Sequence, residues 1–443
     1  MLILVTSLLI ILVTTDVHLE PRATCSIGKV YFSTSFQAGD LIVGSFVQLC
    51  SFYEDNFHTS QYLHEIKCYG TSFSFLRQYL ALIYAVEEIN KSSQILPNIT
   101  LGYQIFDSCG CEFKAMSGLL DIMSGEQQTI PNYDCWKNNK LVGFLGDLTT
   151  STTQSVAQFL AVFRYPQISY GSMDPVFHDR VQFPSFYRTI PNEEAEIDGI
   201  VQILKHFGWK WVGLIISDDD TGYRARERIS TELAMMGGCL VFLFAIDYGT
   251  HTHSTMLKGE TMFKEIEKTT VNVIIVFINP KYIYESIAIL LYSRIPERIC
   301  ITSSLFTDFI TFPHNLKQNV IFNRALSLLI QEGEIPDFHT FLKSFALSNY
   351  PQSKLTEYIW QDVFDCIFPS WTENKPTSDR ICTGNESIID EVSMLGNYRV
   401  TYRVYTAVYA LAHALHNLYS AQPPANHWDK LEYMRNLKPW QVG

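Results

Sequence analysis

The sequence has no basic tract, and acidic residues outnumber basic ones along its 443 residues. It contains 33 Lys and Arg against 45 Asp and Glu, which gives a formal net charge of −12. Proteins that bind nucleic acid place clustered Lys and Arg against the phosphate backbone. We therefore expect no nucleic-acid partner. Hydrophobic residues make up 47% of the chain, so a mostly disordered protein is excluded as well.

Long apolar runs are also missing. A helix that spans a bilayer needs about 20 apolar residues, whereas the longest runs here, such as 240–246, are typical of buried strands. Residues 2–13 are apolar at all but two positions and precede a polar stretch at 14–22, as in a secretory signal. No Lys or Arg precedes this run, and a buried strand is the alternative. We expect residues 1–20 to be a signal peptide and the chain to be exported without a membrane anchor of its own.

Motifs of common enzyme classes are absent. The sequence has no GxSxG, no glycine-rich phosphate loop and no HExxH. His251 and His253 have no Cys or carboxylate nearby, and we interpret them as part of a solvated loop. The aspartates at 218–220 lack the alternating ligands of an EF-hand and are interpreted as a turn that caps the next helix. We expect no catalysis and no metal cofactor, with a secreted α/β hydrolase as the alternative.

Ten cysteines are present, but none has CxxC or zinc-type Cys/His spacing. In an exported chain, disulfides are the default state of cysteine. Cys109 and Cys111 flank a single Gly, and we interpret them as one disulfide partner and one spare thiol. Acceptor sequons for N-glycosylation occur at Asn90, Asn98 and Asn385 and also indicate the secretory pathway.

Short apolar runs alternate with helical patterns through the chain. Strands separated by helices of about ten to fifteen residues are typical of α/β folds with parallel sheets. The βα units are too many for one core, which favours two doubly wound lobes with ligands at the carboxyl ends of their strands. We expect strands at 100–106, 141–145, 167–170, 211–216, 240–246, 271–278 and 298–303, helices at 75–90, 155–163, 193–207, 223–236, 262–268, 281–294 and 398–419, and loops at 247–258 and 369–391.

Hydroxyl residues are concentrated at 146–155, where the sequence reads GDLTTSTTQS. The segment joins the expected strand at 141–145 to the expected helix at 155–163. Hydroxyls and free backbone N–H groups at the start of a helix form an anion site, which the helix dipole favours further. Ser and Thr are also preferred N-cap residues, so capping alone is an equal alternative.

Several longer strings resemble the ligand-binding region of family C G-protein-coupled receptors. They are LPNITLGY at 96–103, FDSC at 106–109, YPQISY at 165–170, FPSFYRTIPN at 183–192, WKWVG at 209–213 and AVYALAHAL at 407–415. The wording VQFPS at 181–185 is most similar to the vomeronasal type 2 pheromone receptors, which are related to the calcium-sensing receptors. The resemblance extends from about Cys25 to about Leu437.

This resemblance implies a two-lobed Venus flytrap of the type I periplasmic-binding-protein kind. Each lobe is then a mostly parallel sheet flanked by helices, with lobe 1 at 25–191 and 325–443 and lobe 2 at 192–324. Family members bind amino acids, peptides or cations between the lobes, and lobe closure rearranges a dimer. We accordingly expect an amino acid, peptide or protein cue as ligand, and a homo- or heterodimer with another family C receptor.

The resemblance also implies which residues contact the ligand. Family members hold an α-carboxylate with hydroxyls and amides that match Thr150, Ser151 and Thr153, together with backbone that matches Gly171. A carboxylate that meets the ligand's α-amino group matches Glu193.

Three other positions depart from the family pattern. Met173 replaces a hydroxyl residue, Thr221 replaces the aromatic residue that covers the ligand, and Ser304 replaces an acidic or amide residue. We expect these positions to line the cleft and to change its shape. A wider cleft for a peptide or protein cue is one interpretation, and a partner subunit that senses amino acids is the other.

Part of the cysteine pattern is carried over in the same way. The resemblance implies the disulfides Cys68–Cys109 and Cys366–Cys382, and an inter-subunit bridge at Cys135. Cys239 matches a cysteine whose partner lies in a downstream Cys-rich domain. The resemblance leaves Cys25, Cys50, Cys111 and Cys300 unassigned.

Family members continue with a Cys-rich domain and a seven-helix membrane domain, which contacts the G protein. Neither is present here, so we expect the sequence to be truncated. The full-length receptor is expected in the plasma membrane with this region outside, and a secreted solute-binding protein or decoy without signalling is the alternative. The resemblance admits Ca²⁺ as a ligand, but no motif here supports it.

Overall fold

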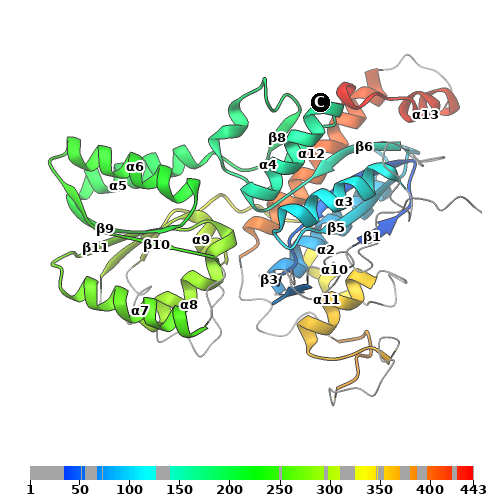
Figure 1. The fold of residues 1–443 in the computed structure, drawn as a ribbon. Helices are drawn as coiled ribbons and strands as arrows, with labels where there is room; N and C mark the ends of the chain where they lie inside the picture. The colour runs from blue at the N-terminus through cyan, green and yellow to red at the C-terminus, as the bar shows by residue number, and fades with distance from the viewer. Residues whose placement is uncertain are drawn as a thin grey trace, which may run out of the picture.

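The computed structural model shows two α/β lobes side by side (Figure 1). It describes residues 34–50, 52–54, 67–71, 73–125, 140–248, 252–293, 298–309, 325–345, 347, 354–369, 380–386, 397–421 and 427–442. The predicted signal peptide at 1–20 and the predicted inter-subunit Cys135 lie outside these residues, as does Cys25.

The first lobe is built on a six-stranded sheet in the order β1-β5-β2-β6-β7-β8. Its neighbouring strands are parallel except for β1, which runs antiparallel to β5. All seven residues of β2 and of β5 are buried, as expected for strands with helices on both faces. The strands are β1 (Thr34–Gln37), β2 (Leu41–Val47), β5 (Leu101–Asp107), β6 (Lys140–Leu145), β7 (Gln167–Ser169) and β8 (Phe186–Arg188).

The second lobe is built on a five-stranded sheet in the order β10-β9-β11-β12-β13, in which all neighbours are parallel. Its strands are β9 (Trp211–Ser217), β10 (Cys239–Ile246), β11 (Val273–Phe277), β12 (Ile299–Thr302) and β13 (Ala325–Ser327). The two separate sheets confirm the predicted α/β class and the two-lobed architecture. The second sheet extends slightly further than predicted, because β13 pairs with β12 although we assigned 325–443 to lobe 1.

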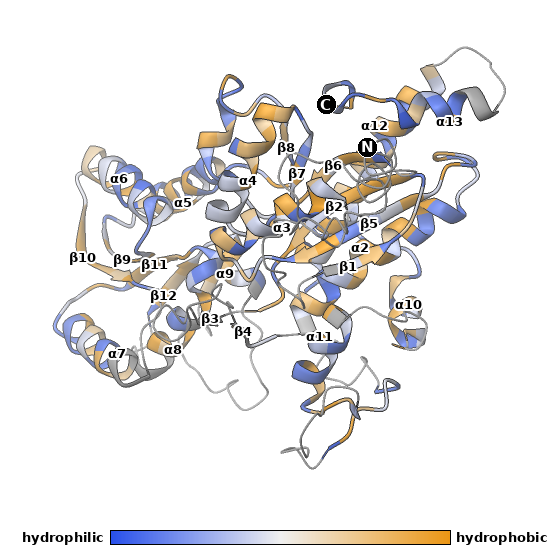
Figure 2. Ribbon diagram, turned by 45° about the vertical axis from the view of Figure 1, so that its right-hand side comes forward, coloured by the Kyte–Doolittle hydropathy of each residue, from blue (hydrophilic) through white to orange (hydrophobic). Residues whose placement is uncertain are grey.

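Helices cover both faces of each sheet. In the first lobe, α3 (Glu112–Ser124) and α4 (Thr150–Phe163) pack on one face, and α2 (Phe73–Lys91) and α12 (Arg399–Ala421) on the other. In the second lobe, α5 (Glu193–Phe207) and α6 (Asp220–Met235) lie opposite α7 (Thr252–Glu267) and α8 (Ile283–Ser293). Figure 2 shows mostly hydrophobic strands between helices that also carry hydrophilic residues.

The remaining described elements are short. A two-stranded antiparallel sheet joins β3 (Phe52–Glu54) to β4 (Lys67–Tyr69). Helices α10 (Phe338–Ser344), α11 (Lys354–Phe364) and α13 (His427–Arg435) belong to the first lobe, and α9 (Ser304–Phe309) follows β12 in the second. Single 3₁₀ turns occupy Pro175–His178, Pro280–Tyr282 and Pro439–Gln441.

Helix α5 has the predicted bounds because its capping signals are local. The side chain of Asn192 accepts hydrogen bonds from the backbone N–H groups of Glu194 and Ala195, and three glutamates occupy the first turn. Gly208 ends the helix in the left-handed conformation with φ of 64°. The predicted cap of α6 is also present, because the Asp219 side chain accepts from the N–H of Gly222.

Helices α4 and α7 begin five or more residues before their predicted starts. Helix α4 starts at Thr150, not at residue 155, because the hydroxyls of Thr152 and Thr153 donate to the carbonyl of Thr149 and stay within the helix. Helix α7 starts at Thr252, so the predicted loop at 247–258 is wrong over its second half. His253 is therefore helical, and the interpretation of a solvated loop does not hold for it.

Candidate functional site

A cavity lies between the lobes, at the carboxyl ends of strands from both sheets. The first lobe contributes residues that follow β6 and β7, and the second lobe contributes residues that follow β9, β11 and β12. This is where parallel α/β sheets bind ligands. The lining residues are Leu148, Thr150, Gly171, Met173, Glu193, Glu196, Thr221, Phe277, Ile278, Asn279, Pro280, Ser303 and Leu305.

Thr150 and Gly171 form the floor of this cavity on the first lobe. Thr150 is the first residue of α4, and its hydroxyl lies 3.1 Å from the Ser172 hydroxyl. A Cβ at Gly171 would collide with the backbone of Leu148, so only glycine fits there. The partly buried hydroxyl of Thr150 and the start of α4 thus lie at the cavity, and the predicted anion site stays a prediction.

The other two hydroxyl residues predicted for this loop lie away from the cavity lining. The Thr153 hydroxyl is fully buried, donates to the Thr149 carbonyl at 2.6 Å and accepts from the Asp147 N–H at 3.2 Å. It therefore holds the loop rather than facing the cleft. Ser151 is also absent from the lining, so Thr150 is the member of the hydroxyl run that faces the cavity.

Glu193 lines the cavity and already pairs with a cation of its own lobe. The Nε atom of Arg224, on α6, donates to its Oε1 at 2.7 Å, and Nη2 donates to Oδ2 of Asp174 at 2.5 Å. Burial raises the pKa of Glu193 to about 7, although the Arg224 guanidinium opposes this shift. The carboxylate assigned to a ligand's amino group is thus occupied by the protein's own side chain.

The three positions that depart from the family pattern also lie around the cleft. Met173 is buried and packs with Ile190 and Leu305 between the lobes. The Thr221 hydroxyl accepts from Arg224 at 3.2 Å at the edge of the cavity. Ser304 lies in a neighbouring cavity, where its backbone N–H donates to Glu196. The structure thus places Thr150, Gly171, Met173, Glu193 and Thr221 around one cavity and Ser304 beside it.

The neighbouring cavity has a volume of about 690 Å³ and adjoins the first, since Met173 and Glu196 line both. Two chain segments that connect the lobes form much of its wall. Besides Met173, Glu196 and Ser304, it is lined by Thr189, Pro191, Ala195, Leu328, Leu329, Ile330, Gln331, Gly333, Tyr402, Arg403 and Thr406.

Sequence reasoning missed Glu196, Arg224 and Arg403. Glu196 follows Glu193 by three residues on α5, a spacing that places both carboxylates on one helix face and was a usable signal. Burial raises the pKa of Glu196 to about 7. The two arginines gave no local signal, because each acts on residues distant in sequence.

Comparison with known proteins shows which family this architecture represents. The family model described as the receptor family ligand binding region matches residues 77–442. The chain belongs to this family. Its relatives with this region are family C G-protein-coupled receptors, as the sequence strings indicated.

Three relatives illustrate the range of the family. The extracellular calcium-sensing receptor of Bos taurus is 28% identical over 410 residues, covering 85% of this chain and 37% of the relative. The vomeronasal type-2 receptor 26 of Mus musculus is 27% identical over 443 residues, covering 96% and 50%. The taste receptor type 1 member 2 of Homo sapiens is 27% identical over 345 residues, covering 76% and 39%. The chain spans half or less of the length of these relatives. In the described residues, no helix is long and apolar enough to cross a bilayer.

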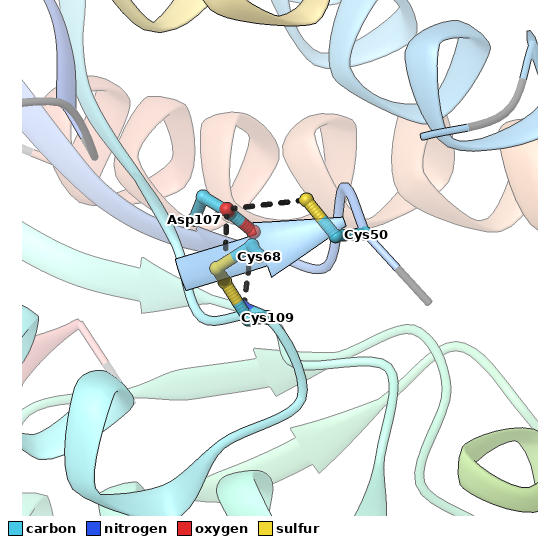
Figure 3. A group of neighbouring side chains, drawn as sticks. All are labelled: Cys50, Cys68, Asp107 and Cys109. Carbon is cyan, nitrogen blue, oxygen red and sulfur yellow. Dashed lines mark hydrogen bonds between the residues drawn. A yellow bond between two sulfur atoms is a disulfide. The ribbon is translucent and has the colours of Figure 1, made fainter. Parts of the chain in front are cut away.

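One group of side chains in this family C region has the composition of a metal site. Cys50, Cys68, Asp107 and Cys109 place their ligand atoms within 4.8 Å of one another (Figure 3). Cys68 and Cys109 are joined in a disulfide, which removes both thiolates, and burial raises the pKa of the Cys50 thiol. The donors left are one carboxylate and one protonated thiol, which do not suit a hard cation such as Ca²⁺.

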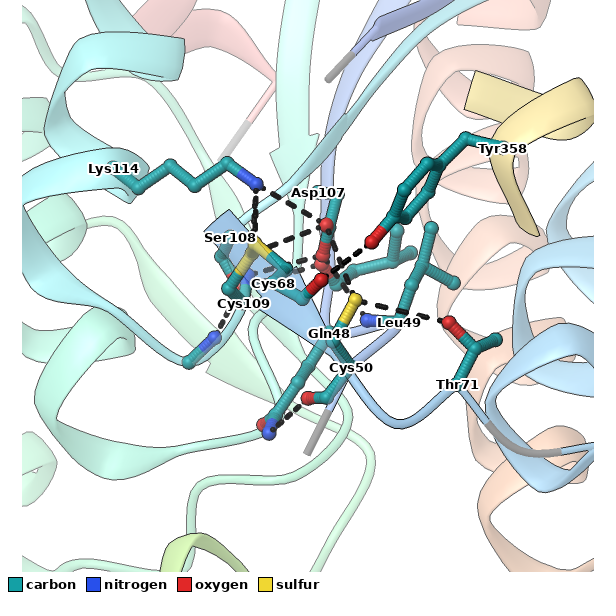
Figure 4. Close-up of polar contacts among 12 residues, drawn as sticks. Gln48, Leu49, Cys50, Cys68, Thr71, Asp107, Ser108, Cys109, Lys114 and Tyr358 are labelled. Atoms are coloured by element: carbon teal, nitrogen blue, oxygen red, sulfur yellow. Dashed lines mark hydrogen bonds and ion pairs between the residues drawn. A yellow bond between two sulfur atoms is a disulfide. The ribbon is translucent and has the colours of Figure 1, made fainter. Parts of the chain in front are cut away.

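A lysine already supplies the positive charge in this group (Figure 4). The Nζ of Lys114 lies 3.2 Å from Oδ2 of Asp107, and both side chains are nearly inaccessible to solvent. Asp107 also accepts from the backbone N–H groups of Leu49 and Cys109 at 3.1 and 3.0 Å. The cluster is therefore a buried ion pair beside a disulfide, and it ties the ends of β2 and β5 together.

The other cysteines and the sequons occupy clear positions. The structure joins Cys366 to Cys382, the second pair that the resemblance implied, while Cys50, Cys111 and Cys300 are buried thiols and Cys239 is an exposed one. Cys109 is thus bonded and Cys111 free, as interpreted from the sequence. Asn90, Asn98 and Asn385 are all exposed.

Proposed function

We propose that this chain is the extracellular ligand-binding region of a chemosensory family C receptor of the plasma membrane. It binds an amino acid, peptide or protein cue between its lobes and signals by lobe closure within a homo- or heterodimer. The observation that carries this proposal is the cavity lined from both lobes, with Thr150 and Gly171 on one side and Thr221 and Asn279 on the other. The relatives, which include vomeronasal, taste and calcium-sensing receptors, support a sensory role rather than catalysis.

The cavity couples a ligand to lobe position because neither lobe forms the site alone. A ligand shifts an equilibrium only through its higher affinity for one of the two states. A cue that contacts both Thr150 and Thr221 gains its full set of contacts only when the lobes are together. Closure is therefore the expected response to binding.

The test combines a cleft variant with a direct measurement of closure. The variant Thr150→Val with Glu193→Gln removes the cleft hydroxyl and the carboxylate charge, and Thr150→Ser restores the hydroxyl as a matched control. Small-angle X-ray scattering of the purified chain measures the radius of gyration against each of the twenty amino acids and a set of dipeptides. We expect at least one probe to contract the unmodified chain and the Thr150→Ser control, and not the double variant.

An equal contraction in the double variant would show that the cue binds elsewhere. Contraction without any response of a full-length receptor that contains this region would instead favour a soluble solute-binding protein.

The predicted dimer is tested separately. Cys135→Ser should convert a dimer band on a non-reducing gel to a monomer, and a persistent dimer band would exclude Cys135 as the bridge.

A further inference from the structure

Arg403 is a buried cation with unused hydrogen-bond donors. It belongs to α12 of the first lobe, and 2% of its side chain is exposed. Its Nη2 donates to Oδ2 of Asp308 at 3.1 Å, an ion pair that crosses between the lobes. Within the described residues, Nε and Nη1 have no acceptor. Buried guanidinium N–H groups without acceptors are costly, so a ligand that supplies an acceptor gains affinity.

The cavity beside Arg403 has the size and lining of a small-molecule site. Its volume of about 690 Å³ lies within the range of about 300–1,000 Å³ that is typical of such sites. Apolar side chains form much of the wall, with Leu328, Leu329 and Ile330 on one connecting segment and Met173 in the cluster against which Ile330 packs. The cavity thus combines one cationic group with an apolar surface.

The acidic groups near Arg403 do not fill its free donors. Asp308 is shared, since Nη1 of Arg399 also lies 3.4 Å from its Oδ1. Glu196 accepts the backbone N–H of Ser304, and burial raises its pKa to about 7, so part of it is protonated at neutral pH. A ligand carboxylate near Arg403 is therefore repelled less than two fully ionised, unpaired carboxylates at Asp308 and Glu196 would repel it.

The cleft offers little to a ligand's ammonium group. Glu193 and Asp174 are the carboxylates next to Arg224, and Arg224 donates to both. A zwitterionic amino acid would have to compete with Arg224 for Glu193. Glu196, the carboxylate that lines both cavities, already accepts the Ser304 N–H and is partly protonated at neutral pH. The ammonium group would then be poorly paired, and an unpaired buried charge is costly.

We propose that the cavity at Arg403 binds an apolar carboxylate that lacks a free α-ammonium group, with the carboxylate held by the guanidinium of Arg403. This proposal rests on the proposed function and names the chemical class of its cue. Two sources share the chemistry: a small branched-chain acid, and the C-terminus of a short hydrophobic peptide.

The test compares three probes that share one carbon skeleton. 4-Methylpentanoate is leucine without its amino group, and 4-methylpentanamide lacks the charge. Isothermal titration of the purified chain should show 4-methylpentanoate binding at least about tenfold more tightly than leucine or the amide, since charge-assisted hydrogen bonds are the stronger ones. Acetyl-Ala-Leu distinguishes the sources, because tighter binding than 4-methylpentanoate indicates a peptide C-terminus.

Two sets of variants locate the site. Leu329 lines the cavity and is 54% exposed, so both Leu329→Asp and Leu329→Asn should fold. The Asp variant should repel the acid, whereas Asn, which has the same shape as Asp but no charge, should not. We expect 4-methylpentanoate to bind about tenfold more weakly to the Asp variant only, and binding of the amide to be unchanged in both. Arg403→Gln should remove the preference for the acid over the amide, and Arg403→Lys should restore part of it.

Other outcomes overturn the proposal. Leucine that binds as tightly as 4-methylpentanoate, or acid binding that ignores Leu329→Asp, excludes the site at Arg403. If the acids fail while an amino acid contracts the chain through Thr150, this inference is wrong and the proposed function stands. If no probe binds or contracts the chain, both are overturned.

Discussion

Arg224 links Glu193 to Asp174 across the cleft, with its Nε 2.7 Å from one carboxylate and its Nη2 2.5 Å from the other. Asp174 lies between β7 and β8 of the first lobe, whereas Arg224 lies on α6 of the second lobe. The guanidinium therefore joins the two lobes. It also takes the place that an ammonium group would need at Glu193.

Replacing Arg224 should loosen the lobes and free Glu193. Arg224→Met keeps much of the side-chain length but leaves two mostly buried carboxylates without their cation. We expect a loss of about 1–3 kcal/mol of stability, near the lower end because the Arg224 side chain is 37% exposed. The radius of gyration should rise, and leucine should bind more tightly than to the unmodified chain. Urea unfolding, scattering and titration measure the three effects.

Arg228→Met is the matched control on the same helix. Arg228 is 53% exposed, its partner Asp198 is 57% exposed, and its other partner Glu232 keeps its ion pair with Lys205, so the loss should be at most about 1 kcal/mol. Equal losses for Arg224→Met and Arg228→Met would contradict a special role of the Arg224 bridge.

Glu196 should make stability fall as the pH rises through neutrality. Burial is the main cause that raises its pKa to about 7, the Asp308 carboxylate adds to the shift, and the Ser304 N–H and Arg403 oppose it. Because the folded pKa exceeds the value of about 4.5 in the unfolded chain, the stabilisation is complete below about pH 4.5 and is lost as pH rises through about 7.

The variant Glu196→Gln should remove this dependence. Relative to Glu196→Gln, the unmodified chain should lose up to about 3 kcal/mol between about pH 5 and about pH 8, since one pKa unit corresponds to about 1.4 kcal/mol. Urea unfolding at several pH values measures the difference. Glu194→Gln, at an exposed position of the same helix turn, should follow the unmodified chain. Parallel curves for all three proteins would mean that Glu196 is ionised throughout.

Local signals in the sequence predicted much of the fold but only part of the site. The bounds of α5 followed from Asn192, an acidic first turn and Gly208, which are all within the helix or next to it. Thr150 was predicted at the site from the hydroxyl-rich segment that follows a strand and from the family resemblance, whereas Gly171 was predicted from the resemblance alone; both line the cavity. The start of α4 was harder to predict, because Ser and Thr side chains also bond to the backbone in loops. Here the hydroxyls of Thr152 and Thr153 donate to the carbonyl of Thr149.

The two arginines could not be predicted because their roles depend on tertiary structure. Arg224 contacts Asp174 from 50 residues away, and Arg403 contacts Asp308 from 95 residues away. No periodicity or motif records such pairs. The free donors of Arg403 became visible only once its neighbours were placed around it.

The three sequons should differ in their structural role. Asn90 is exposed, but its side-chain amide bonds both backbone groups of Leu101, donating to the carbonyl at 2.8 Å and accepting from the N–H at 2.7 Å. Asn90→Gln should therefore destabilise the chain by about 1 kcal/mol or more, because the longer side chain moves the amide away from Leu101. Asn385→Gln should remove one glycan with little effect on stability, whereas Asn98→Gln should also lower stability, because residue 98 has a φ of 63°, which Asn tolerates better than Gln.

Protein secreted from mammalian cells provides the measurement. Mass shifts on glycosidase treatment count the glycans, and thermal unfolding reports stability for each variant. Asn90→Gln with unchanged thermal stability would show that the bonds to Leu101 contribute little. An unshifted mass for Asn98→Gln or Asn385→Gln would show that the sequon is not used.

The buried pair of Asp107 and Lys114 should be strongly coupled. Lys114 is 5% exposed, so Asp107→Asn leaves a buried ammonium group without its counter-ion and should cost about 3 kcal/mol or more. Asn still accepts the N–H groups of Leu49 and Cys109, so this loss reflects the charge rather than the backbone bonds. Lys114→Met should also destabilise the chain, because it leaves Asp107 ionised and buried.

The double variant separates the ion pair from its surroundings. With Asp107→Asn and Lys114→Met together, neither charge remains. The double variant should therefore lose about 1–3 kcal/mol less stability than the sum of the two single losses. Urea unfolding under non-reducing conditions keeps the Cys68–Cys109 disulfide intact in all four proteins. Additive losses would mean that water or another group compensates Lys114. A positive coupling energy would instead show that Lys114 is the cation of this cluster. Its ammonium group then occupies the Asp107 carboxylate that a metal ion would need as a ligand.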